Sequence, residues 1–177
     1  MDQPIPKTVI QQGDWFVLPA PSWNPDGPSA TPPPEATVGG WMVEVDGTIG
    51  PFEPNPGYLP ADDSTPSDPI DAMLRLIAAG EKLGDELVAM ICHSVVEIGC
   101  GDDDLPLIGA APDGAPCVVV ATAAVQKRTV DVDRWMLMVG SDLPRIVPRG
   151  VDIMLNPSGV APFRLLINTM RGDPATS

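Results

Sequence analysis

The hydrophobic pattern changes along the chain from short strand-like runs to helical spacing and back. Two strand signals lie early, a β-rich run over 14–18 that ends at a proline and an alternating run over 40–45. The second run is followed by the pair Asp46-Gly47, which suits the positive φ of a tight turn, and by a further run over 48–52. We therefore predict a short strand and then a hairpin in the first third of the chain.

Helical signals occupy the middle of the chain. Asp68 is followed by Pro69, a pairing typical of an N-cap and the first helical position. Apolar residues then recur at helical spacing until Gly80, which predicts a helix over about 68–79. A second helix is predicted over 85–93, with an apolar face made of Leu87, Met90 and Ile91.

The last part of the chain is sheet-like again. The continuous apolar run over 117–120 indicates a strand buried on both faces, and further strands are expected at 135–139 and 151–155. The final element, over 162–170, is expected to be a helix with Phe163, Leu166 and Ile167 facing inward. Hairpin-type turns and helices without regular β-α-β alternation predict an α+β fold with a mostly antiparallel sheet and two or three helices.

Proline divides the chain unevenly, since 15 of the 23 prolines fall in the first 69 residues. Proline fixes its own φ and lacks the donor that a sheet ladder needs, so strands in this region must be short or at an edge. We therefore expect three parts: a Pro-rich arm over 1–37 packed on the domain, a single α+β domain over 38–171, and a tail over 172–177.

Charge is also distributed unevenly. The chain has 24 acidic and 10 basic residues, for a formal charge of −14, and residues 1–113 alone carry −16. This balance excludes a nucleic-acid or anionic-membrane binder whose affinity comes from bulk charge. It favours a basic protein as the partner.

The cysteines indicate a reducing compartment. Three of them at scattered spacing fit free thiols better than a disulfide framework. No apolar run approaches the roughly 18 residues of a membrane helix, and the first twelve residues hold no apolar block that predicts a secretory signal. A cytosolic location is therefore expected.

One glycine motif needs to be weighed as a cofactor site. Val96-Glu97-Ile98-Gly99-Cys100-Gly101 is similar to the first motif of class I S-adenosylmethionine methyltransferases, in which a strand leads into glycines and a helix. Asp103 stands at the third glycine position, and the residues after it do not have a helical pattern. We therefore expect no cofactor.

Metal sites are weighed in the same way. Asp102, Asp103 and Asp104 offer the carboxylate oxygens that hard cations prefer, but the EF-hand spacing is absent. The three cysteines and His93 lack the short paired spacing of structural zinc. We expect no metal, and we interpret the acidic run either as a solvated turn or as a contact patch for a basic partner.

No catalytic signature appears in the sequence. On a helix, the neighbours Cys92 and His93 point about 100° apart and cannot act as a nucleophile and base on each other. The rival hypothesis is a small hydrolase or transferase that uses His93 with one carboxylate of the acidic run as acid and base. The absence of known motifs favours a protein that is not an enzyme.

Trp23 is the remaining candidate for partner binding. It lies in the loop Pro21-Ser22-Trp23-Asn24-Pro25, where it serves either as an exposed anchor for a partner or as a side chain packed under its own prolines. The sequence leaves both interpretations open.

Two segments carry a family resemblance. Ala115-Pro116-Cys117-Val118-Val119-Val120-Ala121-Thr122 and Gly150-Val151-Asp152-Ile153-Met154-Leu155-Asn156-Pro157-Ser158-Gly159 resemble the SseB-like domain and the type VII secretion system-associated proteins of actinobacteria. The hairpin region over 39–56 and the turn over 112–114 are similar to that group as well, so the resemblance covers about 38–168. Ser158 stands where the pattern usually has glycine.

The resemblance implies an α+β domain with a non-catalytic role around secretion, and it carries over no functional residues. Joined to the acidic charge, it favours a cytosolic protein that holds a basic secreted effector, either as an immunity factor that inhibits a toxin or as a chaperone. A structural accessory of the secretion apparatus is the alternative.

Overall fold

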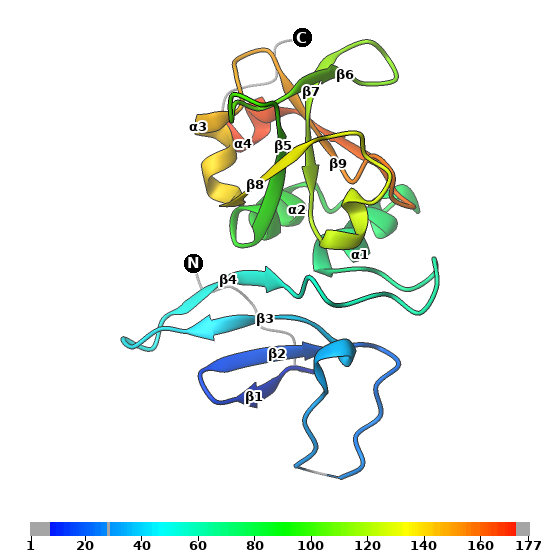
Figure 1. The fold of residues 1–177 in the computed structure, drawn as a ribbon, viewed down its shortest axis with the longest axis vertical. Helices are drawn as coiled ribbons and strands as arrows, with labels where there is room; N and C mark the ends of the chain where they lie inside the picture. Colours follow the sequence, from blue (N-terminus) through cyan, green and yellow to red (C-terminus); the bar gives the residue numbers. More distant parts are fainter. Residues whose placement is uncertain (1–7, 28, 173–177) are drawn as a thin grey trace.

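The computed structural model of the chain describes residues 8–27 and 29–172. Figure 1 shows two sheets in separate layers, with the helices gathered around the larger, C-terminal one. The smaller sheet is antiparallel and the larger one is mixed, so the expected α+β class is confirmed. The first seven residues of the expected arm and the tail from residue 173 onward lie outside the described residues.

The smaller sheet, sheet A, contains the predicted early strands. It consists of β1 (Ile10–Gln12), β2 (Trp15–Pro19), β3 (Thr37–Val43) and β4 (Ile49–Pro54), paired in that order. The β3–β4 hairpin is confirmed, with Gly47 at φ 83° in its turn. The range of the expected Pro-rich arm holds β1 and the predicted early strand β2, both of which are strands of sheet A, and the expected boundary at residue 37 falls where β3 begins.

Sheet A has its own small core. The rings of Trp41 and Phe52 lie 4.9 Å apart on neighbouring strands, and Phe16 is paired with Trp41 from the other side. A side chain at Gly39 would collide with the Phe52 ring, so the close packing of this cluster requires glycine there.

Two helices follow sheet A, as predicted. The first, α1 (Pro69–Ala78), is capped by Asp68, whose carboxylate accepts hydrogen bonds from the backbone N–H groups of Ile70 (2.9 Å) and Asp71 (3.0 Å). The second, α2 (Gly84–Cys92), buries Leu87 and Ile91. Both agree with the predicted ranges to within a residue or two.

The larger sheet, sheet B, has the strand order β10-β9-β7-β5-β8, with β6 beside β7. Its strands are β5 (Val95–Cys100), β6 (Ile108–Ala110), β7 (Pro116–Ala121), β8 (Arg134–Val139), β9 (Asp152–Leu155) and β10 (Phe163–Leu165). Only the β7–β9 pair among these is parallel. β7 is a central strand, and Cys117, Val118 and Val120 of its apolar run are buried, whereas Val119 is half-buried.

The expected C-terminal helix is partly wrong. Phe163–Leu165 forms β10 against β9, and only Ile167–Arg171 is helical, as α4. Ile167 is buried as expected, whereas Leu166 is 42% exposed. A further short helix, α3 (Leu143–Ile146), follows β8. Edge pairing thus overrides the apolar spacing that suggested one longer helix.

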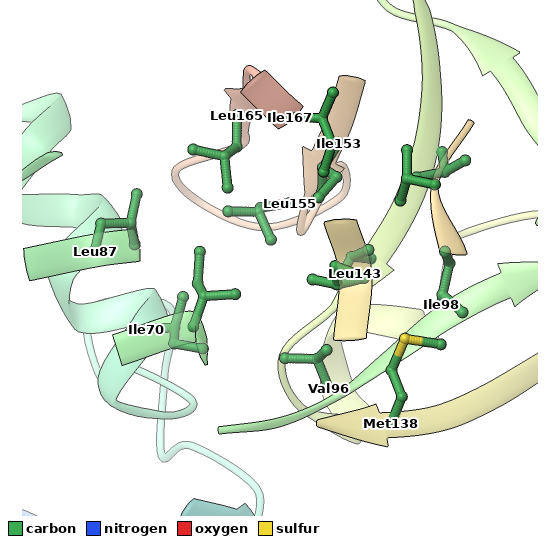
Figure 2. Packing of buried hydrophobic residues seen from close by; sticks show 14 of the residues in the cluster. Ile70, Leu87, Val96, Ile98, Met138, Leu143, Ile153, Leu155, Leu165 and Ile167 are labelled. Carbon is green, nitrogen blue, oxygen red and sulfur yellow. The ribbon is translucent and has the colours of Figure 1, made fainter. Parts of the chain in front are cut away.

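The main core lies between sheet B and the helices. Figure 2 shows Ile70 and Leu87 of the helices, Leu143 of α3 and the alternate strand residues Val96, Ile98, Ile153 and Leu155 in one cluster. Burying a side chain of this size stabilises the fold by roughly 1.5–3 kcal/mol. The opposite face of sheet B carries the alternate side chains that point away from this core, and it is only partly covered.

One backbone contact joins the two sheets. The N–H of Phe52 in β4 donates to the carbonyl of His93 at 2.8 Å, and Phe52 forms a parallel bridge with Ser94. This contact fixes sheet A beside the start of β5.

Candidate functional site

The acidic run lies in an exposed turn. Asp102, Asp103 and Asp104 follow β5 and lead into β6, and all three are exposed. The N–H of Leu105 donates to Asp103 Oδ1 at 3.1 Å, and Asp104 pairs with Arg134 at 3.0 Å across the strand ends. The turn is therefore solvated and lies beside the first residue of β8.

The glycine motif does not have the geometry of a cofactor loop. After Gly101 the chain turns and continues into β6, and Asp104 adopts a φ of 59°. A backbone that cradles a dinucleotide or methyl donor leads instead into a helix, whose N-terminus faces the ligand. This segment is a tight turn, in which the Gly101 N–H donates to the carbonyl of Leu105 at 3.0 Å.

His93 lies far from the acidic run. It follows α2, and its Nδ1 lies 2.8 Å from the carbonyl oxygen of Ala89. β5 separates His93 from Asp102, and at about 3.3 Å per residue a strand of that length places the two at opposite ends. The structure does not bring His93 and the carboxylates of the rival acid–base hypothesis together.

The cysteines and possible metal ligands are scattered. Cys100 and Cys117 are buried and Cys92 is half-buried, and burial raises the pKa of each thiol. Within the ranges 8–27 and 29–172, no group of three or more His, Cys, Asp or Glu side chains is placed to hold a metal ion. In the same ranges no helix is long and apolar enough to cross a bilayer.

Trp23 is half-buried and packs against the core of sheet A. The backbone N–H of Trp23 donates to the carbonyl of Ala20 at 3.0 Å, which closes a turn in the loop. The packed interpretation fits this arrangement better than the exposed anchor.

A buried polar cluster joins segments that the sequence did not connect. Its members come from the start of α1, the end of β7, the end of β9 and a short 3-10 helix, and they are Ser67, Asp68, Asp71, Thr122, Gln126 and Asn156. The Thr122 hydroxyl donates to Asp68 at 2.7 Å, and Asn156 donates to that hydroxyl at 2.8 Å. Thr122 and Asn156 belong to the two segments that carry the family resemblance, so those segments meet here.

The electrostatics of the cluster depend on Asp68. Burial raises the pKa of Asp68 above its ordinary value of 3.8, while hydrogen bonds from Thr122, the Asp71 N–H and Ser67 act in the opposite direction. Both oxygens of Asp68 are engaged, one by backbone N–H groups and one by hydroxyls. Such a carboxylate is committed to structure and has no lone pair directed at a substrate.

Asp71 is also tied to the fold. Its Oδ2 accepts from the Ser67 N–H at 2.9 Å and from the Arg75 guanidinium at 2.9 Å. Arg75 in turn donates to the carbonyl groups of Asp63 and Thr65 and so holds the preceding loop against α1. The ion pair thus fixes a loop, which is a structural role.

A cavity of about 370 Å³ lies next to this cluster. Its polar wall includes Ser67, Gln126 and Arg128, and Leu59 and Val160 belong to its apolar part. A Cβ at Gly159 would lie 2.7 Å from Gln126 Oε1, so a side chain there would displace the Gln126 amide. The lining contains neither His93 nor any of the cysteines.

The face of sheet B opposite the main core carries a second organised group. Lys127 Nζ lies 2.6 Å from Glu97 Oε1 and 5.8 Å from the centroid of the Trp135 ring. Further along the same face, Cys117, Val119 and Met154 line an apolar cavity of about 370 Å³. This face combines apolar side chains with ion pairs, since Arg164 beside Met154 also pairs with Asp152 at 3.2 Å.

The segment that forms sheet A and the loop after it carries only acidic charges, although Arg75 and Arg128 lie beside its last carboxylates, Asp62 and Asp63. Residues 8–74 contain no Lys, Arg or His. Eight carboxylates of this segment are exposed: Asp14, Asp26, Glu35, Glu44, Asp46, Glu53, Asp62 and Asp63. Hydrogen bonds from Thr48 lower the pKa of Asp46, and those from Ser64 lower the pKa of Asp62.

No protein-family model matches the chain, and neither the curated proteins nor the solved structures contain a match. The resemblance to secretion-associated proteins therefore stays a prediction. The sequence did locate the acidic segment, whereas the buried cluster could be recognised only once the ends of β7 and β9 were placed side by side.

Proposed function

We propose that the protein is a non-enzymatic, cytosolic binding protein that holds a basic secreted effector of a type VII secretion system, as an immunity factor or a chaperone. The observation that carries the proposal is the acidic surface of sheet A, which has exposed carboxylates and no cationic side chain from residue 8 to residue 74. A surface of one sign attracts a partner of the other sign and speeds its encounter.

The geometry of the titratable groups supports a binding role over catalysis. The buried carboxylates Asp68 and Asp71 are engaged by backbone and side-chain donors, and His93 lies at the other end of β5 from the acidic turn. An acid–base pair needs side chains within hydrogen-bond reach of one substrate. Neither cavity brings together such a pair from the candidates that the sequence offered.

The rigidity of the acidic surface supports the same role. Prolines restrict the loops around sheet A, and its strands are pinned by the cluster of Trp41 and Phe52. A surface that is already ordered loses less conformational entropy when a partner binds.

The test is affinity capture from the native cell at low and moderate salt, with partners identified by mass spectrometry. We expect a basic protein to be captured, and less of it at the higher salt concentration because salt screens exposed charges. A partner held equally well at both salt concentrations would remove the electrostatic argument, and capture of no protein would contradict the proposal.

A matched pair of variants locates the surface. Glu44→Lys/Glu53→Lys reverses two exposed charges of sheet A, and Glu81→Lys/Glu86→Lys makes the same change in charge next to and within α2. We expect the first variant to lose most of the captured partner and the second to retain most of it. Equal losses would show that net charge alone matters and that sheet A is not the binding surface.

Activity and solubility assays of the captured effector then distinguish an immunity factor from a chaperone. An immunity factor abolishes the activity of the effector at a one-to-one ratio, whereas a chaperone improves its solubility or export and leaves its activity intact. Binding to the secretion apparatus in the absence of any effector would instead identify the structural accessory.

A further inference from the structure

The strand β8 forms one edge of sheet B. It pairs with β5 from Val95–Val139 to Cys100–Arg134 without a register shift, and among the described residues it pairs with no other strand. Long, regular edge strands offer a ready template for another extended chain. Natural edges are blunted by prolines, bulges or inward-pointing charges, and β8 contains none of these.

The register shows which backbone groups of β8 point outward. The N–H of Gly140 donates to the carbonyl of Ser94 at 2.8 Å. Counting from this hydrogen-bonded pair, every second residue of β8 bonds to β5. Met138, Met136 and Arg134 then bond to β5, whereas Val139, Leu137 and Trp135 direct their N–H and C=O groups away from it.

An independent contact confirms this alternation. The carbonyl of Gly99, the residue opposite Trp135, accepts a hydrogen bond from Leu107 at 2.9 Å and therefore points away from β8. Apart from the sheet ladders themselves, no backbone hydrogen bond within the described ranges uses Trp135, Leu137 or Val139. The outer edge of β8 thus presents a row of donors and acceptors.

The side chains along this edge are apolar. Met136 and Met138 pack in the main core, so Trp135, Leu137 and Val139 lie on the opposite, partly covered face of the sheet. Leu137 is 68% exposed, whereas Trp135 is held by Lys127. An added strand would therefore place alternate apolar side chains beside Leu137.

One end of the edge is strongly acidic. Asp131 and Asp133 precede β8 directly and are exposed, and the acidic turn with Asp102 and Asp103 lies beside Arg134. Arg134 is already paired with Asp104. The unbalanced charge at this end is negative, which suits lysine or arginine in the occupant.

The charge also argues against a second copy of this chain as the occupant. Pairing β8 with its own copy would bring two chains of charge −14 together. We propose that the outer edge of β8 docks an extended segment of the partner protein, apolar at alternate positions and basic at the end beside Asp131 and Asp133. The choice of a basic occupant rests on the proposed function, whereas the edge itself rests on the register.

The direct test uses a synthetic probe. It is an end-blocked peptide of alternating valine and threonine with two lysines at one end, made in both sequence directions so that parallel and antiparallel pairing are each sampled. Binding is measured by fluorescence anisotropy against the full chain. We expect one direction to bind, and we expect methylation of alternate backbone nitrogens of that peptide to abolish binding, because it blocks the ladder and leaves the charge unchanged.

The matched protein variants are Leu137→Pro and Leu137→Thr. Both remove the exposed apolar side chain, but only proline removes the central outward N–H, at an edge position where proline is tolerated. We expect Leu137→Pro to weaken probe binding tenfold or more relative to Leu137→Thr, with circular dichroism showing that both are folded. If the proline variant fails to fold, the comparison of the methylated and unmethylated peptides on the unchanged protein tests the backbone pairing instead.

The charge arm uses Asp131→Asn/Asp133→Asn. We expect this variant to bind the lysine-ended probe severalfold more weakly and a probe with threonines in place of the lysines equally well. Failure of every probe to bind, or equal binding by the methylated peptide, would overturn the proposal. Sedimentation that shows a dimer lost in Leu137→Pro would identify a second copy as the occupant and overturn it too.

The last arm separates this inference from the proposed function. If the effector is captured as well by Leu137→Pro as by Leu137→Thr, the proposed function stands and docking at β8 is wrong. If no effector is captured by any form of the protein, the proposed function fails, and the basic partner as occupant fails with it.

Discussion

At the scale of single residues, Asn156 connects two strands through one side chain. It is fully buried, its Oδ1 accepts from the Thr122 N–H at 3.0 Å, and its φ is 45°. Asparagine is one of the few residues other than glycine that adopt this backbone conformation readily. The position therefore requires both an amide side chain and a tolerance for positive φ.

Replacing Asn156 separates these two requirements. We expect Asn156→Ala to lower the free energy of unfolding by about 2–4 kcal/mol. The buried N–H and hydroxyl of Thr122 each lose a hydrogen bond, and alanine is strained at this φ. Asn156→Gly loses the same bonds without the strain and should be about 1 kcal/mol more stable than the alanine variant. Urea unfolding measures both. Equal stability of the two variants would show that the backbone conformation carries no cost.

Asp68 gives a prediction about pH. Because burial raises the pKa of Asp68 in the folded protein, the native state keeps this proton to a higher pH than the unfolded chain does. The contribution of Asp68 to the free energy of unfolding therefore falls as pH rises above about 4 and becomes constant once pH exceeds the raised pKa.

The measurement compares the wild type with Asp68→Asn by urea unfolding from about pH 4.5 to about pH 8. We expect the stability of the wild type relative to the variant to decrease with pH over the lower part of this range. A difference that stays constant over this range would show that the hydrogen bonds from Thr122, Ser67 and the backbone outweigh burial and that the pKa is not raised.

At the scale of elements, Gly140 fixes how β8 turns into the segment before α3. Its N–H extends the β5–β8 ladder, and a Cβ built there would lie only 2.0 Å from the carbonyl oxygen of Ile91. The close approach of this turn to the end of α2 leaves no room for a side chain.

We expect Gly140→Ala to destabilise the protein by roughly 1–3 kcal/mol, because the end of α2 must move away from β8. Gly109→Ala in β6 is the control, since a Cβ there meets nothing within 4 Å. Thermal unfolding should separate the two variants by several degrees. A control that is as unstable as Gly140→Ala would remove the steric argument.

At the scale of the whole molecule, the formal charge of −14 makes the folded chain repel itself. The ion pairs Arg134–Asp104 and Arg145–Asp142 join exposed side chains and contribute little to stability. Salt screens the repulsion between exposed carboxylates more than it weakens such pairs.

We therefore expect Tm at neutral pH to rise by several degrees between about 20 mM and about 500 mM sodium chloride. Glu81→Lys/Glu86→Lys reduces the formal charge to −10 and should show a smaller rise. Calorimetry measures both. A Tm that falls with salt would show that ion pairs outweigh the general repulsion.

The sequence by itself determined the features that depend on neighbouring residues. The Asp68-Pro69 cap, the Asp46-Gly47 turn and the buried character of β7 follow from local chemistry, and the structure confirms each of them. The α+β class followed because such local signals also set the order of the elements. The acidic surface was visible too, since charge is a property of composition.

Only the tertiary structure decided which distant segments meet. Thr122 bonds to Asn156, 34 residues away, and to Asp68, 54 residues away, once β7 and β9 lie parallel. In the same way, pairing made β1 and β2 part of sheet A, turned Phe163–Leu165 into a strand and left β8 at an edge. Strand pairing joins residues far apart in sequence through backbone groups that every residue carries, so no local pattern specifies it.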